Sequence, residues 1–213
     1  MKKVIILGLL FIFLLVFSGA FLFLKQFPDR ELATISASVG NADDCEIGGS
    51  SKVMGVGDFI WWYFNLPGIS QSYIDEGNSF VAAGFDALIC KQGQAGYPEN
   101  LRRIKRLVLH GKQFGESIDA HGENRFSLLH RAVISGDISL IKFLIKEGAD
   151  VTSLTASDAV WYAKPYGNMT SYQLALALRE NEWPVDDEIL QLVSKAGHNE
   201  LRSKTHSPKS LED

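Results

Sequence analysis

The sequence predicts an all-α protein, a short solenoid of about three helix pairs, and three observations support this fold class. Between residues 78 and 199, apolar residues recur at the three- and four-residue spacing of amphipathic helices. Ser, Thr, Asp and Gly stand where such helices would begin and end. A helix–turn–helix pattern also returns along the chain, and about three stacked copies are needed to bury a continuous core.

Residues 1–25 predict a membrane anchor or a signal peptide. After Met1-Lys2-Lys3, Val4–Leu24 is a run of 21 uncharged residues, which as a helix would be about 31 Å long and could cross a bilayer. A cleaved signal is the alternative, because Ser18-Gly19-Ala20 offers small residues for cleavage, although the apolar run continues beyond them. Both interpretations keep the N-terminus in the cytoplasm and export the remainder. In a bacterium we expect a single-pass inner-membrane protein, anchored by residues 4–24, with its domain in the periplasm.

Residues 26–77 are expected to form a linker and an aromatic N-terminal cap. The segment opens polar and then reaches DFIWWYFNLP at 58–67. Asp58 is a candidate N-cap of a short helix, and Pro67 prevents that helix from continuing past Asn65. The large apolar residues between them predict a buried cap over the first helices or, alternatively, an exposed aromatic surface for a partner.

Helical repeats are predicted over residues 78–199. In the first pair, LRRIKRLVLHG at 101–111 has the spacing of a second helix, and its partner is assigned to about 78–91 by position alone. In the clearest unit, at 118–152, Ser127 is a candidate N-cap and Gly136 ends the helix that follows. Asp137 can cap the next helix, which stops at Gly148, where a left-handed residue is needed.

A degraded copy of this unit lies at about 170–199. Thr170 takes the place of Ser127, Gln173 takes the place of His130, and Ile189–Val193 carries the apolar face of a second helix. Residues 200–213 are polar and without periodicity, so we expect a disordered tail there.

The run SLLHRA at 127–132, followed by Gly136 and by LIKEGAD at 144–150, resembles the ankyrin repeat. This resemblance implies a stack of helix pairs that binds other proteins, and it implies a structural role for His130 instead of a catalytic or ligand role. The turn before His130 is about three residues longer than in the family. Ser127 and Thr170 are 43 residues apart, against a family period of about 33, so about ten residues are inserted between them. The implied repeat positions are Ser127, His130, Gly136, Gly148 and Thr170.

These two departures from the family form the candidate partner-binding surface. The insertion SLTASDAVWYAKPYGNM at 153–169 combines aromatic side chains with the turn formers Pro165 and Gly167. Packing of Trp161 back onto the helices is the alternative. The lengthened turn adds polar residues nearby. The candidate binding residues are His121, Glu123, Asn124, Arg125, Trp161, Tyr162 and Tyr166.

Composition and cysteine usage limit the choice of partners. From residue 26 onward, 18 basic and 25 acidic residues give a net charge of about −7, which disfavours nucleic acid and favours a basic partner. Cys45 and Cys90 can form a disulfide in an exported domain or remain free thiols. The cysteines and the five scattered histidines lack the spacing of metal ligands, so neither a metal nor another cofactor is expected.

The sequence predicts a protein-binding module and not an enzyme. It has no nucleophile elbow, zinc-protease motif, P-loop or dinucleotide-binding glycine pattern, and no small-molecule substrate is expected. An enzyme would need a pocket that unites groups such as Asp119, His121 and His130. The chain is similar in size, leader and repeat pattern to bacterial envelope immunity proteins of the ankyrin type, which neutralise toxins such as type VI lipase effectors. The alternative is a periplasmic ankyrin-type protein of envelope stress or scaffolding, as in peroxide defence.

Overall fold

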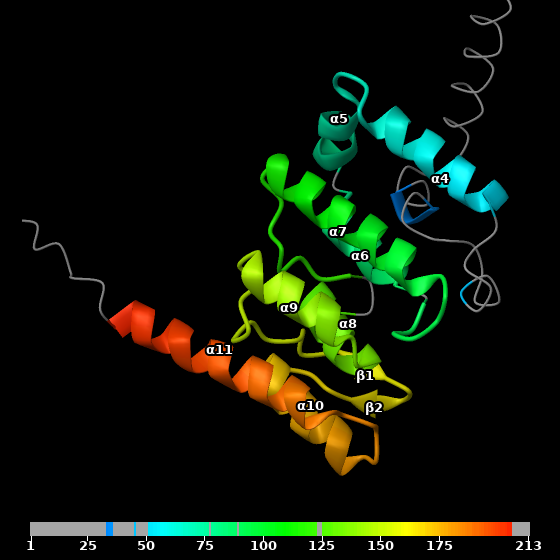
Figure 1. The fold of residues 1–213 in the computed structure, drawn as a ribbon. Coiled ribbons are helices and arrows are strands. Elements are labelled where there is room, and N and C mark those ends of the chain that lie inside the picture. Colours follow the sequence, from blue (N-terminus) through cyan, green and yellow to red (C-terminus); the bar gives the residue numbers. More distant parts are fainter. Residues whose placement is uncertain are drawn as a thin grey trace, which may run out of the picture.

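The computed structural model describes residues 33–35, 45, 51–76, 78–88, 90–122 and 125–205, and this part of the chain is mostly helical. Three helix pairs follow two leading helices, and Figure 1 shows them stacked in chain order, from α4 and α5 at the top to α10 and α11 at the bottom. The predicted all-α class is therefore confirmed. The helices are α4 (Ser51–Phe64), α5 (Ile69–Asp75), α6 (Phe80–Asp86), α7 (Tyr97–Gln113), α8 (Leu128–Ser135), α9 (Ile138–Lys146), α10 (Ser171–Glu180) and α11 (Asp187–Thr205).

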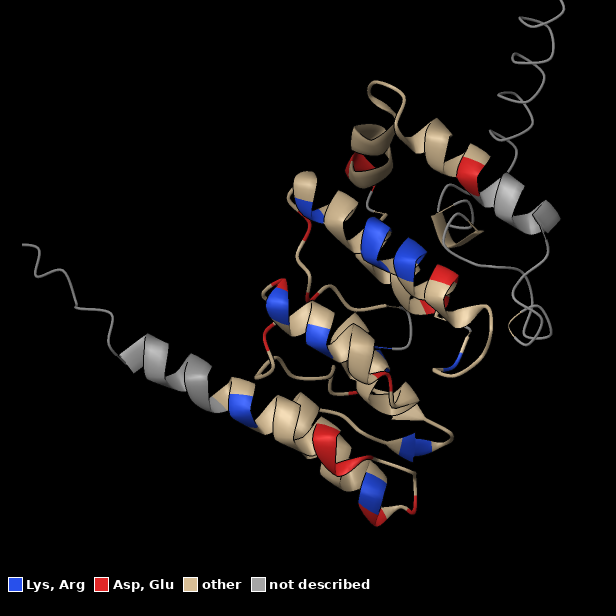
Figure 2. Ribbon diagram, in the orientation of Figure 1, with Lys and Arg blue, Asp and Glu red and all other residues tan. Residues whose placement is uncertain are grey.

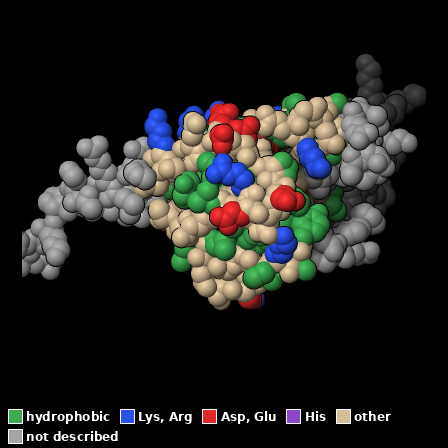
Figure 3. Space-filling model, turned by 90° about the horizontal axis from the view of Figure 1, so that it is seen from below, with side chains coloured by type: hydrophobic (Ala, Val, Ile, Leu, Met, Phe, Trp, Pro, Cys, Tyr) green, Lys and Arg blue, Asp and Glu red, His purple; other side chains and the backbone are tan. Residues whose placement is uncertain are grey.

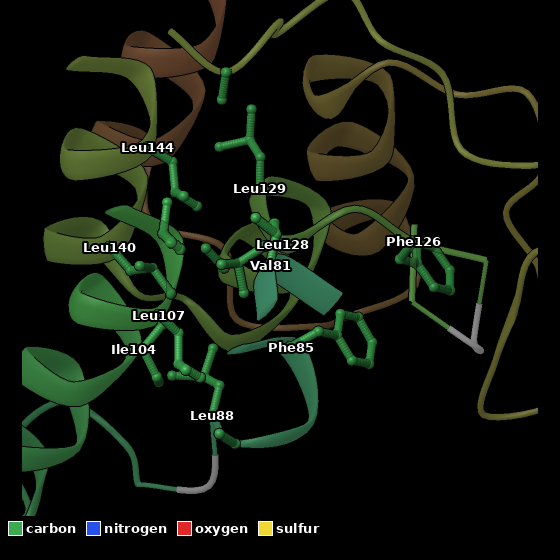
Figure 4. Close-up of a cluster of buried hydrophobic side chains, with 14 of the residues drawn as sticks. Val81, Phe85, Leu88, Ile104, Leu107, Phe126, Leu128, Leu129, Leu140 and Leu144 are labelled. Carbon is green, nitrogen blue, oxygen red and sulfur yellow. The ribbon is translucent and has the colours of Figure 1, made fainter. Parts of the chain in front are cut away.

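The two helices of each pair pack against each other, and each pair also packs against the next pair along the stack. Helices α6, α8 and α10 form one row, because α8 contacts both of its neighbours, and α9 contacts α11 in the second row. Figure 4 shows how side chains from α6 to α9 converge in one cluster, in which Val81, Ile104, Leu128 and Leu140 are buried. This shared core holds the row of first helices in place and so fixes the surface that they present.

The middle pair begins and ends at the residues that the sequence predicts. The Ser127 side chain accepts a hydrogen bond from the His130 amide, and the Ser127 amide donates to His130 Nδ1 at 3.2 Å. Gly136 ends α8 with a φ of 73°, a left-handed conformation that glycine adopts without strain. Asp137 then caps α9 by accepting from the Leu140 amide at 2.9 Å. These caps satisfy backbone groups that would otherwise lack partners at the helix ends.

The first pair differs in length from its prediction. Helix α6 covers Phe80–Asp86 where we expected about 78–91, and α7 covers Tyr97–Gln113 where we expected 101–111. The start of α6 is capped locally by Ser79, whose hydroxyl accepts from the Ala82 amide at 3.0 Å. Glu116 adds a carboxylate that accepts from the amides of Phe80 at 3.0 Å and Val81 at 3.1 Å. Ser79 is a local signal for the start of this helix, whereas the acidic group from outside the helix is revealed by no local sequence pattern.

The aromatic segment is a helix that covers the first pair, and the prediction for Asp58 was wrong. Helix α4 begins at Ser51, so Asp58 lies within it and caps nothing; its carboxylate is 3.6 Å from the Arg103 guanidinium on α7. Figure 2 shows acidic colouring on α4 and basic colouring along the neighbouring α7. The helix ends at Phe64, ahead of Pro67, as expected.

The segment is partly buried, as the cap alternative predicts, and partly exposed, and binding of a partner by the exposed part stays a prediction. Ile60, Tyr63 and Phe64 are buried, and the Phe64 ring lies 5.1 Å from the Phe80 ring at the start of α6. Phe59 and Trp62 remain 37% and 40% exposed on the other side of α4. The segment therefore caps the helix stack and also presents an aromatic pair to solvent.

Cys45 and Cys90 form a disulfide, which was one of the two alternatives. Their Cα atoms are 5.3 Å apart, within the usual range for a bridge. The Gly96 amide also donates to the Cys45 carbonyl at 2.8 Å. The bridge fixes residue 45 against the segment that connects α6 to α7.

The last pair closes the stack with a mixed surface. Helix α11 continues to Thr205, so residues 200–205 are helical and the expected disorder was wrong for them; residues 206–213 lie outside the described part. Figure 3, which views the α10–α11 end, shows hydrophobic side chains interspersed with charged ones. A polar outer face is what a terminal repeat needs to remain soluble.

Within the described residues, no helix has both the length and the apolar character to cross a membrane. The predicted anchor at residues 4–24 lies outside those residues.

Candidate protein-binding site

The insertion between the second and third pairs is an ordered hairpin. Its base is closed by Thr155, whose hydroxyl donates to the Tyr166 carbonyl at 2.5 Å and accepts from the Met169 amide at 3.0 Å. Gly167 is required there, because a Cβ atom would overlap the Ser157 carbonyl oxygen. Strands β1 (Val160–Trp161) and β2 (Lys164–Pro165) pair antiparallel above this base. Residues 153–169 thus support a rigid tip.

The tip of the hairpin is strained and exposes a tyrosine. Tyr162 and Ala163 connect the two strands with φ values of 47° and 61°. Positive φ at both central residues defines a type I′ turn, in which Asn and Gly are strongly preferred. A bulky residue in this conformation is unfavourable by about 1–2 kcal/mol. The Tyr162 side chain is nevertheless 75% exposed, so burial does not compensate this strain. Such strain is typical of functional sites.

Aromatic side chains connect this tip to the α10–α11 loop. The Tyr162 ring lies 5.4 Å from Trp161 and 5.4 Å from Trp183, which precedes α11. Trp183 is itself fixed, because its indole nitrogen donates to the Ile134 carbonyl at the end of α8 at 3.0 Å. Figure 1 places the β1–β2 hairpin beside α8 and α10. The three rings therefore form a continuous aromatic wall.

A cavity of about 450 Å³ lies between this wall and the ends of α6 and α8. Its volume falls within the range of sites that bind ligands or anchor side chains of a partner. One side is apolar, formed by Leu88 and Ile134, and Cys90 of the disulfide lies beside it. The lining residues are Leu88, Cys90, Lys91, Arg131, Ile134, Ser135, Trp161, Tyr162, Trp183 and Pro184.

Arg131 is the charged group built into the cavity. Its guanidinium carbon lies 4.6 Å from the Trp161 ring centroid and 5.3 Å from that of Phe85. Burial lowers the pKa of Arg131, and the charges of Tyr162 and Asp86 act in the opposite direction. The cation thus lies against two aromatic rings, as guanidinium groups stack well on aromatic faces.

The predicted residues of the insertion have different positions in this site. Trp161 and Tyr162 both line the cavity. Trp161 also packs back on the core, since its ring lies 6.3 Å from that of Phe126, as the packing alternative predicts, and its role in binding a partner stays a prediction. Tyr166 is only 4% exposed, and its assignment to the binding surface was wrong. Its backbone bonds with Thr155 and Ala159 place it in the base of the hairpin, where its side chain is buried.

The predicted residues of the lengthened turn lie beside the hairpin and do not line this cavity. His121 Nε2 is 3.0 Å from the Leu154 carbonyl oxygen, and the Arg125 guanidinium is 3.4 Å from Asp158. Both partners belong to the insertion, so the two departures from the repeat pattern are adjacent in space. Glu123 and Asn124 lie outside the described residues.

The acid and imidazole groups that an enzyme would need do not meet in this cavity. His130 is fully buried, and burial, together with the nearby charge of His121, lowers its pKa to about 4. Asp119 instead accepts a hydrogen bond from the Asp150 amide at 3.0 Å. None of the three groups lines the cavity that contains Trp161 and Arg131.

Sequence analysis missed most of the cavity lining, including its two cations, Lys91 and Arg131, and the aromatic Trp183. Arg131 sits within the clearest repeat, where a charged residue between apolar neighbours looks like ordinary solvent-facing surface. Trp183-Pro184 follows a helix end and gave a signal of its own, because a tryptophan beside a proline between two helices is an unusual loop residue.

No known protein family, curated protein or solved structure matches the chain.

Proposed function

We propose that this chain is a protein-binding module of the ankyrin type, whose binding site is the aromatic-walled cavity. The ankyrin assignment is supported by the recurring capping boxes at Ser127 and Thr170 and by the left-handed Gly136 and Gly148. It is also supported by the row formed by α6, α8 and α10, since stacked first helices are the surface that such repeats offer to partners.

The observation that carries the binding function is Tyr162. A tyrosine occupies a turn position that favours Asn or Gly, its side chain faces solvent, and it stands above a preformed cavity. Tyr and Trp dominate the binding energy of protein interfaces because they bury a large area with few rotatable bonds. The strain at this turn is explained when the exposed ring contacts a partner.

We further propose that the module works in the bacterial envelope, anchored by residues 4–24. The Cys45–Cys90 disulfide supports export, because such bonds persist in oxidising compartments such as the periplasm. An immunity protein that neutralises an envelope-targeting toxin, for example a lipase effector, combines this location with a rigid binding surface. It would act by covering the toxin's active face with the tip of the hairpin and the aromatic wall.

The test uses the full chain in its native membrane, co-expressed with the toxin candidate encoded beside it. We expect the wild-type chain to capture that protein and to protect cells from killing, and Tyr162→Asn to reduce both at least about tenfold, a loss typical of an interface hot spot. Tyr172→Asn is the matched control, because Tyr172 is also exposed but lies on α10 outside the cavity lining. Full protection by Tyr162→Asn, or an equal loss from both variants, would overturn the proposal.

A further inference from the structure

The cavity contains a positive charge that the described residues leave without an ion-pair partner. Neither Arg131 nor Lys91, the two cations of the lining, lies within salt-bridge distance of a described carboxylate. The buried Arg131 Nε also lacks a hydrogen-bond partner among the described residues. A cation that is partly removed from water and not paired is unfavourable, and a carboxylate placed against it relieves this cost.

The contacts of the Arg131 guanidinium group make it suitable for binding a planar anion. The guanidinium carbon lies 4.6 Å from the Trp161 ring centroid and 5.3 Å from the Phe85 ring centroid, so two aromatic rings contact this side chain. A stacked guanidinium keeps its N–H groups at the edge, where they match the two oxygens of a carboxylate. Because the stack already fixes the side chain, little conformational entropy is lost when an anion binds.

The charged groups around the cavity favour an anion as well. Lys91 adds a second positive charge to the lining, and Lys164 on the hairpin is held by Asn181 at 2.6 Å. Asp86 is the acid whose charge acts on Arg131, although the two form no salt bridge. The site is therefore locally cationic in a chain with a formal net charge of −4. Charges beyond about 8–10 Å are screened at physiological salt, so the local sign decides what binds.

The apolar part of the cavity favours an acidic side chain that has an apolar residue next to it in the partner. Leu88 and Ile134 form apolar lining, and Tyr162 and Trp183 form a wall beside them. An apolar neighbour of the anion would bury its area there, which contributes roughly 25 cal/mol per Å².

We propose that the cavity binds an acidic side chain of the partner, with its carboxylate on the edge of Arg131 and an adjacent apolar residue against Tyr162 and Trp183. This inference rests on the proposed binding function and names the chemistry that the same site recognises. The partner surface is accordingly acidic and apolar at its centre, opposite in sign to what the net charge of the chain predicts.

The test compares blocked pentapeptides, Ser-Leu-Glu-Phe-Ser and its Gln counterpart, with the full chain in detergent. Tryptophan indole ¹⁵N–¹H signals report binding, since Trp161 and Trp183 line the cavity and Trp61 and Trp62 do not. We expect the Glu peptide to shift the Trp161 and Trp183 signals at about tenfold lower concentration than the Gln peptide, a preference typical of one charge-assisted pair. A Gln peptide with a free terminal carboxylate should bind no better than its blocked form.

Three variants separate a recognition role for Arg131 from a structural role. Arg131→Gln should abolish the preference for Glu, and Arg131→Lys should retain part of it, because Lys keeps the charge without the planar edge. Arg106→Gln is the matched control, since that guanidinium stacks on Trp61 at 4.2 Å away from the cavity lining and its loss should leave the preference unchanged.

Equal binding of the Glu and Gln peptides would overturn the inference, as would a preference that survives Arg131→Gln. Tighter binding of the free terminal carboxylate would also overturn it, because the site would then recognise a chain end. Toxin capture separates this inference from the proposed function. If Arg131→Gln still captures the toxin and Tyr162→Asn does not, the proposed binding site is correct and the proposed acidic anchor is wrong.

Discussion

The α8–α9 and α10–α11 pairs begin with the same capping device and then diverge. Ser127 with His130 forms a capping box at α8, and Thr170 with Gln173 forms one at α10. His130 is fully buried, whereas Gln173 is exposed. The turn before α8 places Phe126 in the core, whereas the hairpin before α10 presents Tyr162 to solvent.

This difference indicates that the middle pair mainly stabilises the stack, whereas the insertion before the last pair carries the candidate binding site. The middle pair has neighbours on both sides, so its helices pack against two others, although the turn before α8 also contains a residue with positive φ, Arg125 at 66°. The last pair has one packed side, and the insertion before it carries the strained, exposed residues of the candidate site. Strain at the hairpin persists because the base at Thr155 and Gly167 holds it in place.

The largest expected effect comes from the core of the middle pair. Leu140 is fully buried between pairs, so Leu140→Ala should lower the free energy of unfolding by about 3–4 kcal/mol through lost burial and a residual cavity. Leu192→Ala, in the half-buried face of α11, should lower it by roughly half as much or less. Urea unfolding followed by circular dichroism measures both. Equal losses would show that the α8–α9 and α10–α11 pairs contribute equally to stability, which would contradict the difference drawn between them.

A pH-dependent effect should distinguish the two capping boxes. The pKa of His130 is about 4 in the folded chain because of burial, against about 6.5 when unfolded. The unfolded state therefore binds a proton first as the pH falls, so stability is present above pH 6.5 and declines between pH 6.5 and 4. The decline due to His130 is about 2–3 kcal/mol by pH 4.5.

His130→Gln copies the box at α10 and should remove this decline. Gln173 already fills the same role there, because its side-chain oxygen accepts from the Thr170 amide at 2.9 Å. Unfolding of wild type and variant at pH 7.5 and pH 4.5 measures the difference. Gln173→Ala carries no titrating group and should lose the same stability at both pH values. A decline of wild-type size in His130→Gln would contradict the role assigned to His130.

Local sequence signals predicted the helices of the middle pair because each of their ends is determined locally. Ser127, Gly136 and Asp137 act on amides or conformations within a few residues, so their positions in the sequence are sufficient. The start of α6 combines a local cap, Ser79, with Glu116, which lies 36 residues after Phe80 and which no local pattern reveals. Asp58 was misassigned for the same reason, since its partners Arg103 and Arg106 are distant in sequence.

The candidate site was predicted in part. Aromatic residues in a long insertion indicated Trp161 and Tyr162, but composition cannot tell an exposed tyrosine from a buried one, and Tyr166 proved to be buried. Arg131 and Trp183 join the site only when α8 and the α10–α11 loop are brought together by the stack. Net charge was equally limited, because it averages over the chain and hides a local cationic cavity.

The smallest expected effect is on the free energy of unfolding, and it has opposite signs at the turn after α8 and at the tip of the hairpin. Gly136→Ala should lower the free energy of unfolding by about 1 kcal/mol, because φ is 73° there and an added Cβ meets no other atom within 4 Å, so the backbone alone opposes it. Ala163→Gly should raise it by roughly 0.5–1 kcal/mol, because relief of the left-handed strain exceeds the entropy gained by the unfolded chain. The Ala163 side chain is not part of the cavity lining, so Ala163→Gly should leave toxin capture unchanged, whereas Tyr162→Asn should relieve strain at the same turn and lose capture. Thermal unfolding and capture, measured on the same preparations, show whether the strain at the hairpin serves the tyrosine. A stabilised Tyr162→Asn variant that still captures the toxin would mean that it does not.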